Sequence, residues 1–369
     1  MPTALMVDLE KGKSKYQKFF PLGLLKYGTY LKEKGYKVKY IGVGEPIIGK
    51  PDLICFSFIF MFNHQMNIKW VMAYRKKYPN AKIEVGGPSL TMYADTYKKY
   101  LKNHVDYKIG IQDEFEYLKP DYDGAKINFS YGFTSRGCPR KCDWCIVPKI
   151  EGGVTNLPKW EYLIDKKHDL FSCMDNNIIA LGPKKIDEVL GVIENKNMIL
   201  DINQAMDCRI FANNTKIQDV FWKYNGRMKL FRFSWDSKEQ DRYIDRTIEV
   251  TNAMKTKETN TWYMLYGFND SLEEIHGRIK KLLSLKTQIK PMRFKNLISG
   301  KYNNSWGGME KDFADAIAAA NPTGLLVPAQ SYLWGDTPKD FKENIKKILR
   351  AKKLLGRTLT SAESRRAVS

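Results

Sequence analysis

The chain of 369 residues has no long hydrophobic run, no internal repeat and no low-complexity tract. Its longest apolar stretch, Leu53 to Phe62, has the length of a buried strand. It falls far short of the ~20 residues that a membrane-spanning helix needs. The first residues also lack the basic-then-apolar pattern of a secretory signal. We therefore expect no transmembrane segment, a cytoplasmic location and, from the length, more than one globular domain.

Acidic residues are scarce relative to basic ones: 41 Asp and Glu stand against 61 Lys and Arg, a net charge of +20. A charge of this size attracts polyanions at long range, so nucleic acid and anionic membranes are candidate partners. Lysine pairs such as Lys280–Lys281 and Lys346–Lys347 are equally explained as solvated helix faces. The charge leaves both interpretations open and says nothing about the reaction.

Cysteine and histidine are few, with six and four residues, and the cysteines are unevenly placed. A disulfide framework is not expected in a long chain without an export signal. Cys138, Cys142 and Cys145 fall within one short segment, whereas the others are scattered. Of the scattered ones, Cys173 and Cys208 are expected to be packing residues. The three clustered cysteines are therefore the first candidates for chemistry.

Short β-type runs alternate with helical stretches, which is the pattern of parallel α/β architecture. Residues 1–122 are predicted to form an open, doubly wound, Rossmann-like parallel sheet, with Gly86-Gly87 after its fourth strand. Pro120–Lys126 is interpreted as a linker because it combines Pro, Asp and Gly. The expected strands are Ala4–Val7, Lys37–Val43, Leu53–Phe60 and Lys82–Val85, and the expected helices are Leu22–Lys34 and Met66–Lys77.

A second series of six strands follows, separated by helical segments, which favours a complete or partial barrel over another open sheet. We place this domain at residues 123–304 and predict a partial (β/α)6 barrel of the TIM type. Residues 305–369 are predicted to form a C-terminal extension, with a basic helix over Pro338–Leu355 and a frayed polar tail from Thr358. The expected barrel strands are Tyr131–Ser135, Phe171–Asp175, Met198–Asn203, Leu230–Trp235, Trp262–Tyr266 and Met292–Asn296.

The clustered cysteines follow the first of these strands with a C-x3-C-x2-C spacing, in Phe133-Thr-Ser-Arg-Gly-Cys138-Pro-Arg-Lys-Cys142-Asp-Trp-Cys145. Residues at i, i+4 and i+7 share one face of a helix, so three small side chains packed in a core are the structural alternative. Polar neighbours such as Arg140, Lys141 and Asp143 suit a buried face poorly. Structural zinc wants four close ligands, whereas three thiolates can hold three irons of a 4Fe–4S cluster and leave the fourth open. The spacing favours the cluster over zinc.

The segment resembles the signature of the radical S-adenosylmethionine superfamily. Members carry this spacing in the loop after the first barrel strand, with an aromatic residue before the last cysteine, here Trp144. The resemblance implies that Cys138, Cys142 and Cys145 bind a 4Fe–4S cluster whose open iron chelates S-adenosyl-L-methionine. Reduction of the cluster by an external donor such as flavodoxin or ferredoxin would cleave that molecule and release a 5′-deoxyadenosyl radical.

Polar residues follow each later strand, where a barrel places its chemistry. The resemblance implies that residues after the second barrel strand contact the methionyl group of S-adenosylmethionine. Residues after the third strand would contact its ribose or carboxylate, and a glycine after the fifth strand would let adenine come close. The alternative is structural: Asn, Ser and Gly are common in turns and helix caps, where their presence requires no cofactor. The catalytic acid, base or hydrogen donor stays unassigned. The cofactor-binding candidates are Trp144, Asn176, Asn177, Asn203, Gln204, Ser234 and Gly267.

The first domain resembles the cobalamin-binding-like domain that precedes many barrels of this superfamily, through Ser57, Gly86-Gly87 and Pro21-Leu-Gly-Leu-Leu25. Cobalamin binders among these proteins often carry Asp-x-His-x-x-Gly after the first strand, with the histidine as lower cobalt ligand. Here the segment reads Asp8-Leu-Glu10-Lys-Gly12, without a histidine. The comparison therefore implies a domain of this kind that does not bind cobalamin.

The leading hypothesis is a radical S-adenosylmethionine enzyme acting on an unidentified substrate. A nucleic acid or a nucleotide-derived compound is the class that the charge favours. The alternative is a non-enzymatic zinc or iron–sulfur protein that binds nucleic acid. The enzyme needs S-adenosylmethionine and a reducible cluster, whereas a zinc module needs neither.

Overall fold

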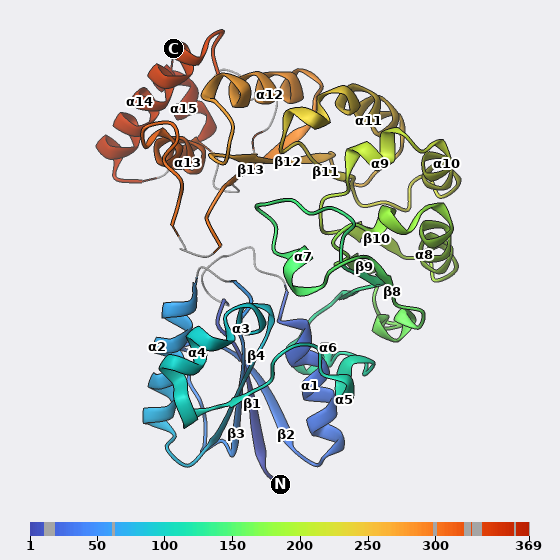
Figure 1. The fold of residues 1–369 in the computed structure, drawn as a ribbon, viewed down its shortest axis with the longest axis vertical. Coiled ribbons are helices and arrows are strands. Elements are labelled where there is room, and N and C mark those ends of the chain that lie inside the picture. Colours follow the sequence, from blue (N-terminus) through green and yellow to red (C-terminus); the bar gives the residue numbers. More distant parts are fainter. Residues whose placement is uncertain are drawn as a thin grey trace. The chain divides into compact units, whose positions relative to one another are not determined.

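The computed structural model describes residues 1–10, 19–60, 63–297, 301–320, 326, 334–357 and 359–368 of the chain. These residues form a mixed α/β structure with parallel sheets, which confirms the predicted class (Figure 1). The chain divides into two compact units. Unit 1 comprises Met1–Arg140 and Ile146–Met174, and unit 2 comprises Lys141–Cys145 and Asp175–Ser369. Within the described ranges, no helix combines the length and apolarity required to cross a membrane.

Unit 1 is built on a sheet of five parallel strands in the order β2-β1-β3-β4-β5. In the middle of the sheet, Ala4 of β1 lies opposite Val38 on one side and Leu53 on the other. Helices connect most of the consecutive strands, because parallel neighbours cannot be joined by a tight turn. The strands are β1 (Thr3–Asp8), β2 (Lys37–Gly42), β3 (Leu53–Ser57), β4 (Lys82–Gly86) and β5 (Asp106–Tyr107).

Helices cover both faces of this sheet, because alternate residues of a strand point to opposite sides. Leu5 and Val7 belong to a core that α2 and α4 complete. Ala4 and Met6, on the other face, belong to a core that α1 completes. The central strands β1 and β3 are therefore mostly apolar and buried, as strands covered on both faces must be, whereas the edge strand β2 carries Lys37 and Lys39. The helices are α1 (Leu22–Glu33), α2 (His64–Lys77) and α4 (Ala94–Leu101).

The rest of unit 1 leads into and out of the cysteine loop. β6 pairs in parallel with β9, and β7 pairs antiparallel with β8. A buried tyrosine holds this region together: the hydroxyl of Tyr122 donates to the carbonyl of Leu163 over 2.8 Å and accepts from the amide of Tyr131 over 3.0 Å. The strands are β6 (Ser130–Gly132), β7 (Ser135–Arg136), β8 (Thr155–Asn156) and β9 (Leu170–Cys173).

In unit 2, parallel strands alternate with helices along the chain. β11, β12 and β13 form a parallel sheet in which Phe233 lies opposite Trp262. Isolated parallel bridges continue this pattern toward earlier residues of the chain. They pair Leu200 of β10 with Met228, and Met206 with Phe233 of β11. The elements are α8 (Pro183–Asn195), β10 (Ile199–Ile202), α9 (Cys208–Ala212), α10 (Thr215–Lys223), β11 (Arg232–Ser234), α11 (Asp241–Ala253), β12 (Thr261–Tyr266), α12 (Leu272–Ser284) and β13 (Gln288–Arg293).

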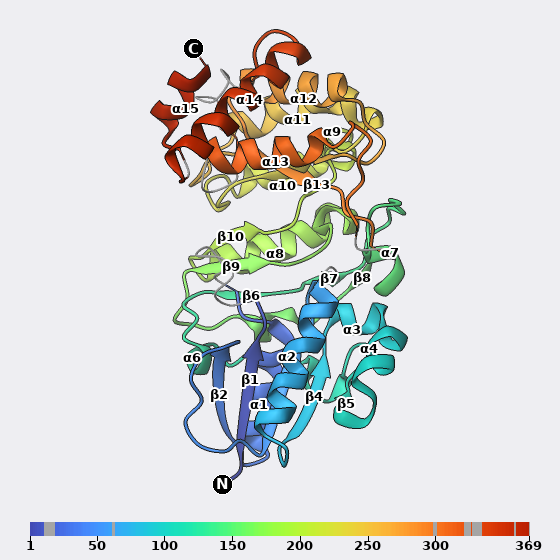
Figure 2. The same ribbon diagram turned by 90° about the vertical axis from the view of Figure 1, so that its left-hand side faces the viewer.

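Three further helices follow in unit 2 and lie side by side in Figure 2: α13 (Met309–Ala320), α14 (Pro338–Leu355) and α15 (Ser361–Val368). α14 coincides with the predicted basic helix. The expectation of a frayed tail is wrong, because α15 occupies it. Thr360 and Glu363 exchange hydrogen bonds at its start, and Arg357 pairs with Glu363 over 2.7 Å, so polar side chains supply the missing helix-end partners.

Two other expectations differ from the structure. The presumed linker Pro120–Lys126 contains α6 (Tyr122–Ala125), whose start is capped by the Asp121 side chain accepting from the amide of Gly124 over 3.2 Å. The last barrel strand, expected at Met292–Asn296, is β13, which begins at Gln288 and ends at Arg293. Pro291 obscures that strand in the sequence because proline is uncommon inside sheets.

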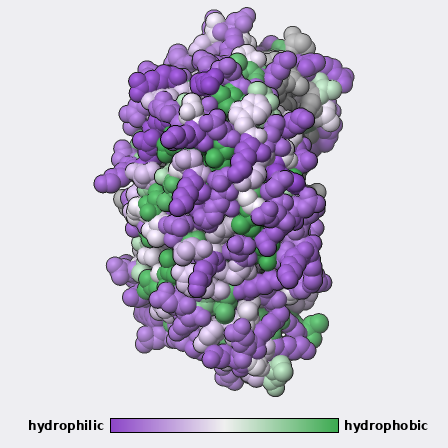
Figure 3. Space-filling view, turned by 90° about the vertical axis from the view of Figure 1, so that its right-hand side faces the viewer, coloured by the Kyte–Doolittle hydropathy of each residue, from purple (hydrophilic) through white to green (hydrophobic). Residues whose placement is uncertain are grey.

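Side chains on the face drawn in Figure 3 are mostly hydrophilic. Hydrophobic residues appear there as small, scattered groups rather than one broad patch. This distribution matches the cores described above, which take up the large apolar side chains. Single exposed apolar residues need no special explanation.

Candidate functional site

The three clustered cysteines lie in an irregular loop rather than on a helix. Residues 137–146, between β7 and α7 (Val147–Ile150), contain neither helix nor strand. Cys138, Cys142 and Cys145 are each half-buried, and the amide of Cys145 donates to the carbonyl of Cys142 over 3.0 Å. The alternative in which three small side chains pack a buried helix face is therefore wrong. A loop that carries three partly accessible thiols remains as the candidate ligand set.

A close backbone contact shapes the turn before Cys138. Gly137 has a φ of +79°, and a Cβ there would lie 2.1 Å from the carbonyl oxygen of Gly153. Next to it, the amide of Cys138 donates to the carbonyl of Gly152 over 3.2 Å. Because the obstructing oxygen belongs to the backbone, it cannot swing aside as a flexible side chain would. The chain can enter the cysteine loop in this way only through glycine.

Carboxylates hold the residues that precede the first cysteine. The amide of Gly137 donates to Glu151 Oε2 over 2.9 Å. The guanidinium of Arg136 pairs with Glu151 and with Glu116, each over 3.2 Å. Hydrogen bonds to ionised groups are stronger than neutral ones, so these contacts fix the start of the loop within unit 1.

A buried lysine continues this network. Lys26 of α1 is 2% exposed, and its ammonium pairs with Glu116 over 3.2 Å and donates to the hydroxyl of Tyr162 over 3.1 Å. Desolvation lowers the pKa of Lys26 from 10.5 to about 8, because it outweighs the attraction of the Glu116 carboxylate. The contacts therefore run from α1 through Glu116 to Arg136, directly before the cysteine loop.

The donors of the triplet suit an iron–sulfur cluster. All six cysteines are thiols rather than disulfides, and thiolates are the ligands that such clusters take. Among the described residues, no three Cys, His, Asp or Glu side chains converge as ligands of a single metal ion. A structural zinc ion needs its ligands around one point, whereas in a 4Fe–4S cluster each thiolate binds a separate iron.

Trp144 connects the cysteine loop to a pocket in unit 2. Its ring meets that of Phe268 edge-on, with centroids 5.3 Å apart, and Phe268 meets Phe294 at 4.6 Å. The pocket has a volume of about 310 Å³ and lies where β12 and β13 end, which is the end of parallel strands where ligands bind. Besides the two phenylalanines it is lined by Lys301, Tyr302, Asn269, Asn296 and Asn303.

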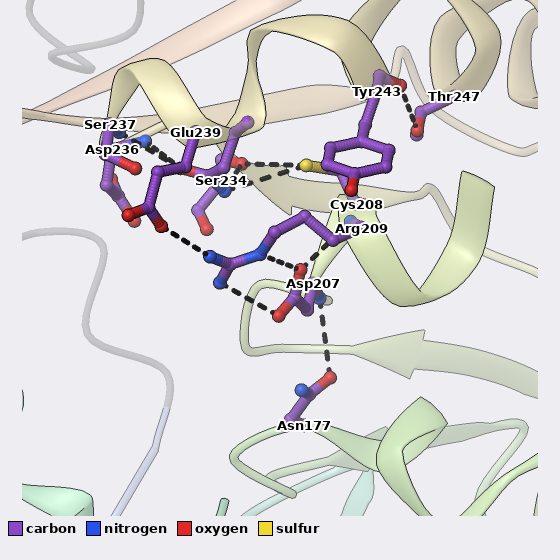
Figure 4. Close-up of polar contacts among 11 residues, drawn as sticks. Asn177, Asp207, Cys208, Arg209, Ser234, Asp236, Ser237, Glu239, Tyr243 and Thr247 are labelled. Carbon is purple, nitrogen blue, oxygen red and sulfur yellow. Dashed lines mark hydrogen bonds and ion pairs between the residues drawn. The ribbon is translucent and has the colours of Figure 1, made fainter. Parts of the chain in front are cut away.

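After β9, Asn177 is brought into contact with the residues that follow β10. Asn177 is 4% exposed, and its side-chain oxygen accepts from the amide of Asp207 over 3.4 Å (Figure 4). Asp207 also pairs with Arg209 over 2.9 Å, and Arg209 reaches Glu239 over 3.6 Å. Asn176 is half-buried beside this network. One of the two predicted asparagines therefore has a structural role in unit 2.

The other pair of predicted cofactor residues, Asn203 and Gln204, directly follows β10, and both are half-buried. The carbonyl of Asn203 accepts from the hydroxyl of Tyr263 over 3.3 Å. Within β10, the carboxylate of Asp201 forms an ion pair with Arg232 of β11. The charge of that arginine is thereby satisfied inside unit 2, and the amide side chains after the strand are partly accessible.

Ser234 lies at the end of β11, beside a buried cysteine. Its carbonyl accepts from Gln240 Nε2 over 2.8 Å and from the thiol of Cys208 over 3.7 Å (Figure 4). Burial, together with the Asp207 carboxylate, raises the pKa of Cys208 to about 12. The thiol therefore stays protonated at neutral pH, which makes it a weak nucleophile.

Gly267 lies in the turn after β12, with a φ of +75°. Its amide donates to Asp270 Oδ2 over 3.2 Å, and a Cβ there would lie 3.1 Å from Cγ of Glu310. The turn and the neighbouring side chain are therefore sufficient reason for a glycine at this position. The close approach of adenine stays a prediction.

Most of the pocket lining was not singled out from the sequence. The pattern places Phe294 and Asn296 inside a strand, whereas β13 ends at Arg293 and leaves both residues beyond the strand end. Tyr302 comes from a later segment, and the Arg293 guanidinium lies 4.2 Å above its ring. A correct strand boundary is the signal that would have revealed these residues.

Comparison with known proteins does not assign the chain to a family. The interpretation of the site therefore rests on the residues and contacts described above. No protein-family model matches the chain, and a search of curated proteins returned no significant match.

Proposed function

We propose that this chain is a radical S-adenosylmethionine enzyme whose Cys138, Cys142 and Cys145 bind a 4Fe–4S cluster. The observation that carries the proposal is the C-x3-C-x2-C triplet, placed in an irregular loop with all three thiols half-buried. The loop follows β6 and β7, and parallel strands alternating with helices come after it in the chain. Three thiolates suit an iron–sulfur cluster better than they suit zinc.

The architecture that we propose is a cobalamin-binding-like Rossmann domain over residues 1–122 and a partial (β/α)6 barrel of the TIM type over 123–304. The strand order β2-β1-β3-β4-β5 supports the first domain, because doubly wound sheets of this order are common cofactor-binding units. Parallel pairing of β6 with β9 and of β11 with β12 and β13 supports the barrel. Glu10 stands where a lower cobalt ligand would be, which supports a domain without cobalamin.

When bound, the cluster would supply the electron for reductive cleavage of S-adenosylmethionine, whose products belong to cofactor chemistry. The chain's own residues hold and shape the site. Glu151 orients the backbone before the first cysteine by accepting a hydrogen bond from the amide of Gly137. The pocket beside Trp144 offers aromatic walls and amide groups to a nucleoside. The proposed contacts to S-adenosylmethionine are Trp144, Asn176, Asn177, Asn203, Gln204, Ser234 and Gly267.

The proposed substrate is a nucleic acid or a nucleotide-derived compound, and the proposed electron donor is a flavodoxin or ferredoxin. The net charge of +20 supports the substrate class, because it raises the local concentration of anions. Acidic electron-transfer proteins would be attracted by the same charge.

The test is reductive cleavage of S-adenosylmethionine by protein purified without oxygen and reconstituted with iron and sulfide. With dithionite as reductant, the wild type should bind about four irons per chain and release 5′-deoxyadenosine, measured by chromatography. Cys142→Ala should lower that rate at least about 100-fold. Cys208→Ala, which removes a thiol outside the triplet, should leave iron content and cleavage unchanged.

Two results would overturn the proposal. One is bound zinc with no uptake of iron. The other is a well-reconstituted cluster that cleaves no S-adenosylmethionine. The first result would favour a zinc protein that binds nucleic acid. The second would leave an iron–sulfur protein without this chemistry.

A further inference from the structure

α14 carries a stripe of five cations along one exposed face. An α-helix turns ~100° per residue, so the spacings of three, four, four and three residues place these side chains within an arc of about 80°. With a rise of 1.5 Å per residue, the stripe is about 21 Å long. All five side chains are exposed. The residues of this basic stripe are Lys339, Lys342, Lys346, Arg350 and Lys353.

Packing fixes the orientation of the basic stripe. Phe341, Ile345 and Ile348 lie on the opposite face of α14 and are buried. α14 packs against α12, α13 and α15, so the helix cannot rotate to hide its charges (Figure 2). The stripe therefore points away from the core of unit 2.

Among the described residues, none of the five cations has an acidic partner. No hydrogen bond or ion pair joins them to any described residue, and every Asp and Glu of the chain lies in the described ranges. Several other lysines of unit 2 are paired, such as Lys281 with Asp245 and Lys311 with Asp315, each over 2.8 Å. Like charges three and four residues apart destabilise a helix. A bound polyanion would relieve this repulsion.

We propose that the basic stripe of α14 binds the phosphate backbone of a nucleic acid. This inference names a partner surface beyond the proposed reaction, and it requires neither the cluster nor S-adenosylmethionine. Helices that lie on membranes need an exposed apolar face, and the apolar face of α14 is buried in unit 2. The exposed face carries its five cations in a straight row, with Glu343 beside them and Leu354 near the end of the helix, and such a row fits regularly spaced phosphates.

The experiment compares two variants that lose the same charge. The stripe variant combines Lys342→Gln, Lys346→Gln, Arg350→Gln and Lys353→Gln, and glutamine preserves helix propensity. The control variant combines Lys50→Gln, Lys76→Gln, Lys98→Gln and Lys216→Gln, all exposed residues without a partner in the described structure. Binding of a fluorescein-labelled single-stranded RNA to the full chain is followed by fluorescence anisotropy across a salt series. Thermal unfolding is recorded for both variants.

The stripe variant should bind at least about tenfold more weakly than the wild type at 100 mM salt. The slope of log K against log salt should fall by about three, since each phosphate contact to a single strand contributes about 0.7. The control variant should stay close to the wild type. Equal weakening of both variants would overturn the proposal, because the charge would then act without a defined surface.

A second assay tests an anionic membrane as the alternative partner. Phosphatidylserine vesicles are presented to the same proteins in a sedimentation assay. Vesicle binding that the stripe variant loses, with RNA binding unchanged, would overturn the proposal in favour of a membrane. Cleavage of S-adenosylmethionine is measured separately. If no cleavage is detected while RNA binding depends on the stripe, the proposed reaction is contradicted and the proposal that the basic stripe binds nucleic acid is supported.

Discussion

At the residue scale, Gly137 shows how a single backbone position shapes the cysteine loop. Its φ is +79°, and the carbonyl oxygen of Gly153 occupies the place of a side chain. Gly152 is a natural control, because its φ is +70° but nothing lies within 4 Å of its hypothetical Cβ. The two positions share a positive φ and differ in the space around their hypothetical Cβ atoms.

We expect Gly137→Ala to lower the free energy of unfolding by at least about 2 kcal/mol, from the left-handed conformation plus the backbone clash. Gly152→Ala should cost only about 1 kcal/mol, the conformational part alone. Urea denaturation followed by circular dichroism measures both. Equal losses would mean that the contact with Gly153 imposes no constraint. Iron uptake should also fall in Gly137→Ala, since the turn precedes Cys138.

Lys26 is the second instructive residue, because a buried ammonium couples stability to pH. Its pKa in the folded chain is about 8, below the 10.5 of an ordinary lysine. Between these pH values the unfolded chain binds the proton and the folded chain does not. Stability therefore rises with pH across this window, since the unfolded state binds more protons there.

We expect the difference in unfolding free energy between the wild type and Lys26→Met to grow in favour of the wild type by about 2 kcal/mol from pH 8 to pH 9.5. The variant removes the titrating group and leaves Glu116 paired with Arg136. Urea denaturation at several pH values measures the difference, in which other titrating groups cancel. A difference that stays flat with pH would show that the buried ammonium does not titrate in this range.

At the element scale, α14 depends on its first residues. Thr337 Oγ1 accepts from the amide of Asp340 over 3.2 Å, and Asp340 Oδ2 accepts from the amide of Thr337 over 2.9 Å. These hydrogen bonds hold the pKa of Asp340 below its usual range. Such a reciprocal cap satisfies amides that the helix itself leaves without partners.

We expect Thr337→Ala to lower the free energy of unfolding by about 1 kcal/mol, the usual cost of removing a capping oxygen. Thr337→Ser keeps that oxygen and should retain most of the stability. Thermal and urea unfolding compare the two variants. If both lost the same amount, the methyl group rather than the cap would account for the effect. RNA binding should persist in either variant, because the basic stripe keeps its charges.

Elements with strong local patterns were predicted well, and elements defined by their surroundings were not. The basic helix at Pro338–Leu355 has a Thr cap, Pro at its first position and Gly356 after its end, and all of these signals are local. β13 was misplaced because Pro291 interrupts its pattern, and it exists because β12 pairs with it along its length. α15 was missed although Thr360-Ser-Ala-Glu363 has the spacing of a capping box, because the helix is short and mostly polar.

At the scale of the whole molecule, each unit has its own arrangement of parallel strands and helices. The excess of basic residues is also a property of the whole chain, and its effect on anions depends on where the charges lack partners. In unit 2 that condition is met along α14, whereas many other lysines form ion pairs. Net charge alone predicts attraction of anions, and the unpaired row of cations on α14 is the place where we propose that a nucleic acid binds.

The sequence by itself determined the mixed α/β class, most strand and helix positions, and the identity of the three clustered cysteines. These features depend on periodicity, propensity and spacing, which act over a few residues. Only the tertiary structure decided that the triplet lies in an irregular loop and that Lys26, Glu116 and Arg136 form one network. It also decided that Trp144 meets the wall of a pocket. Such contacts join residues far apart in the chain, so burial and charge pairing in the folded protein select them.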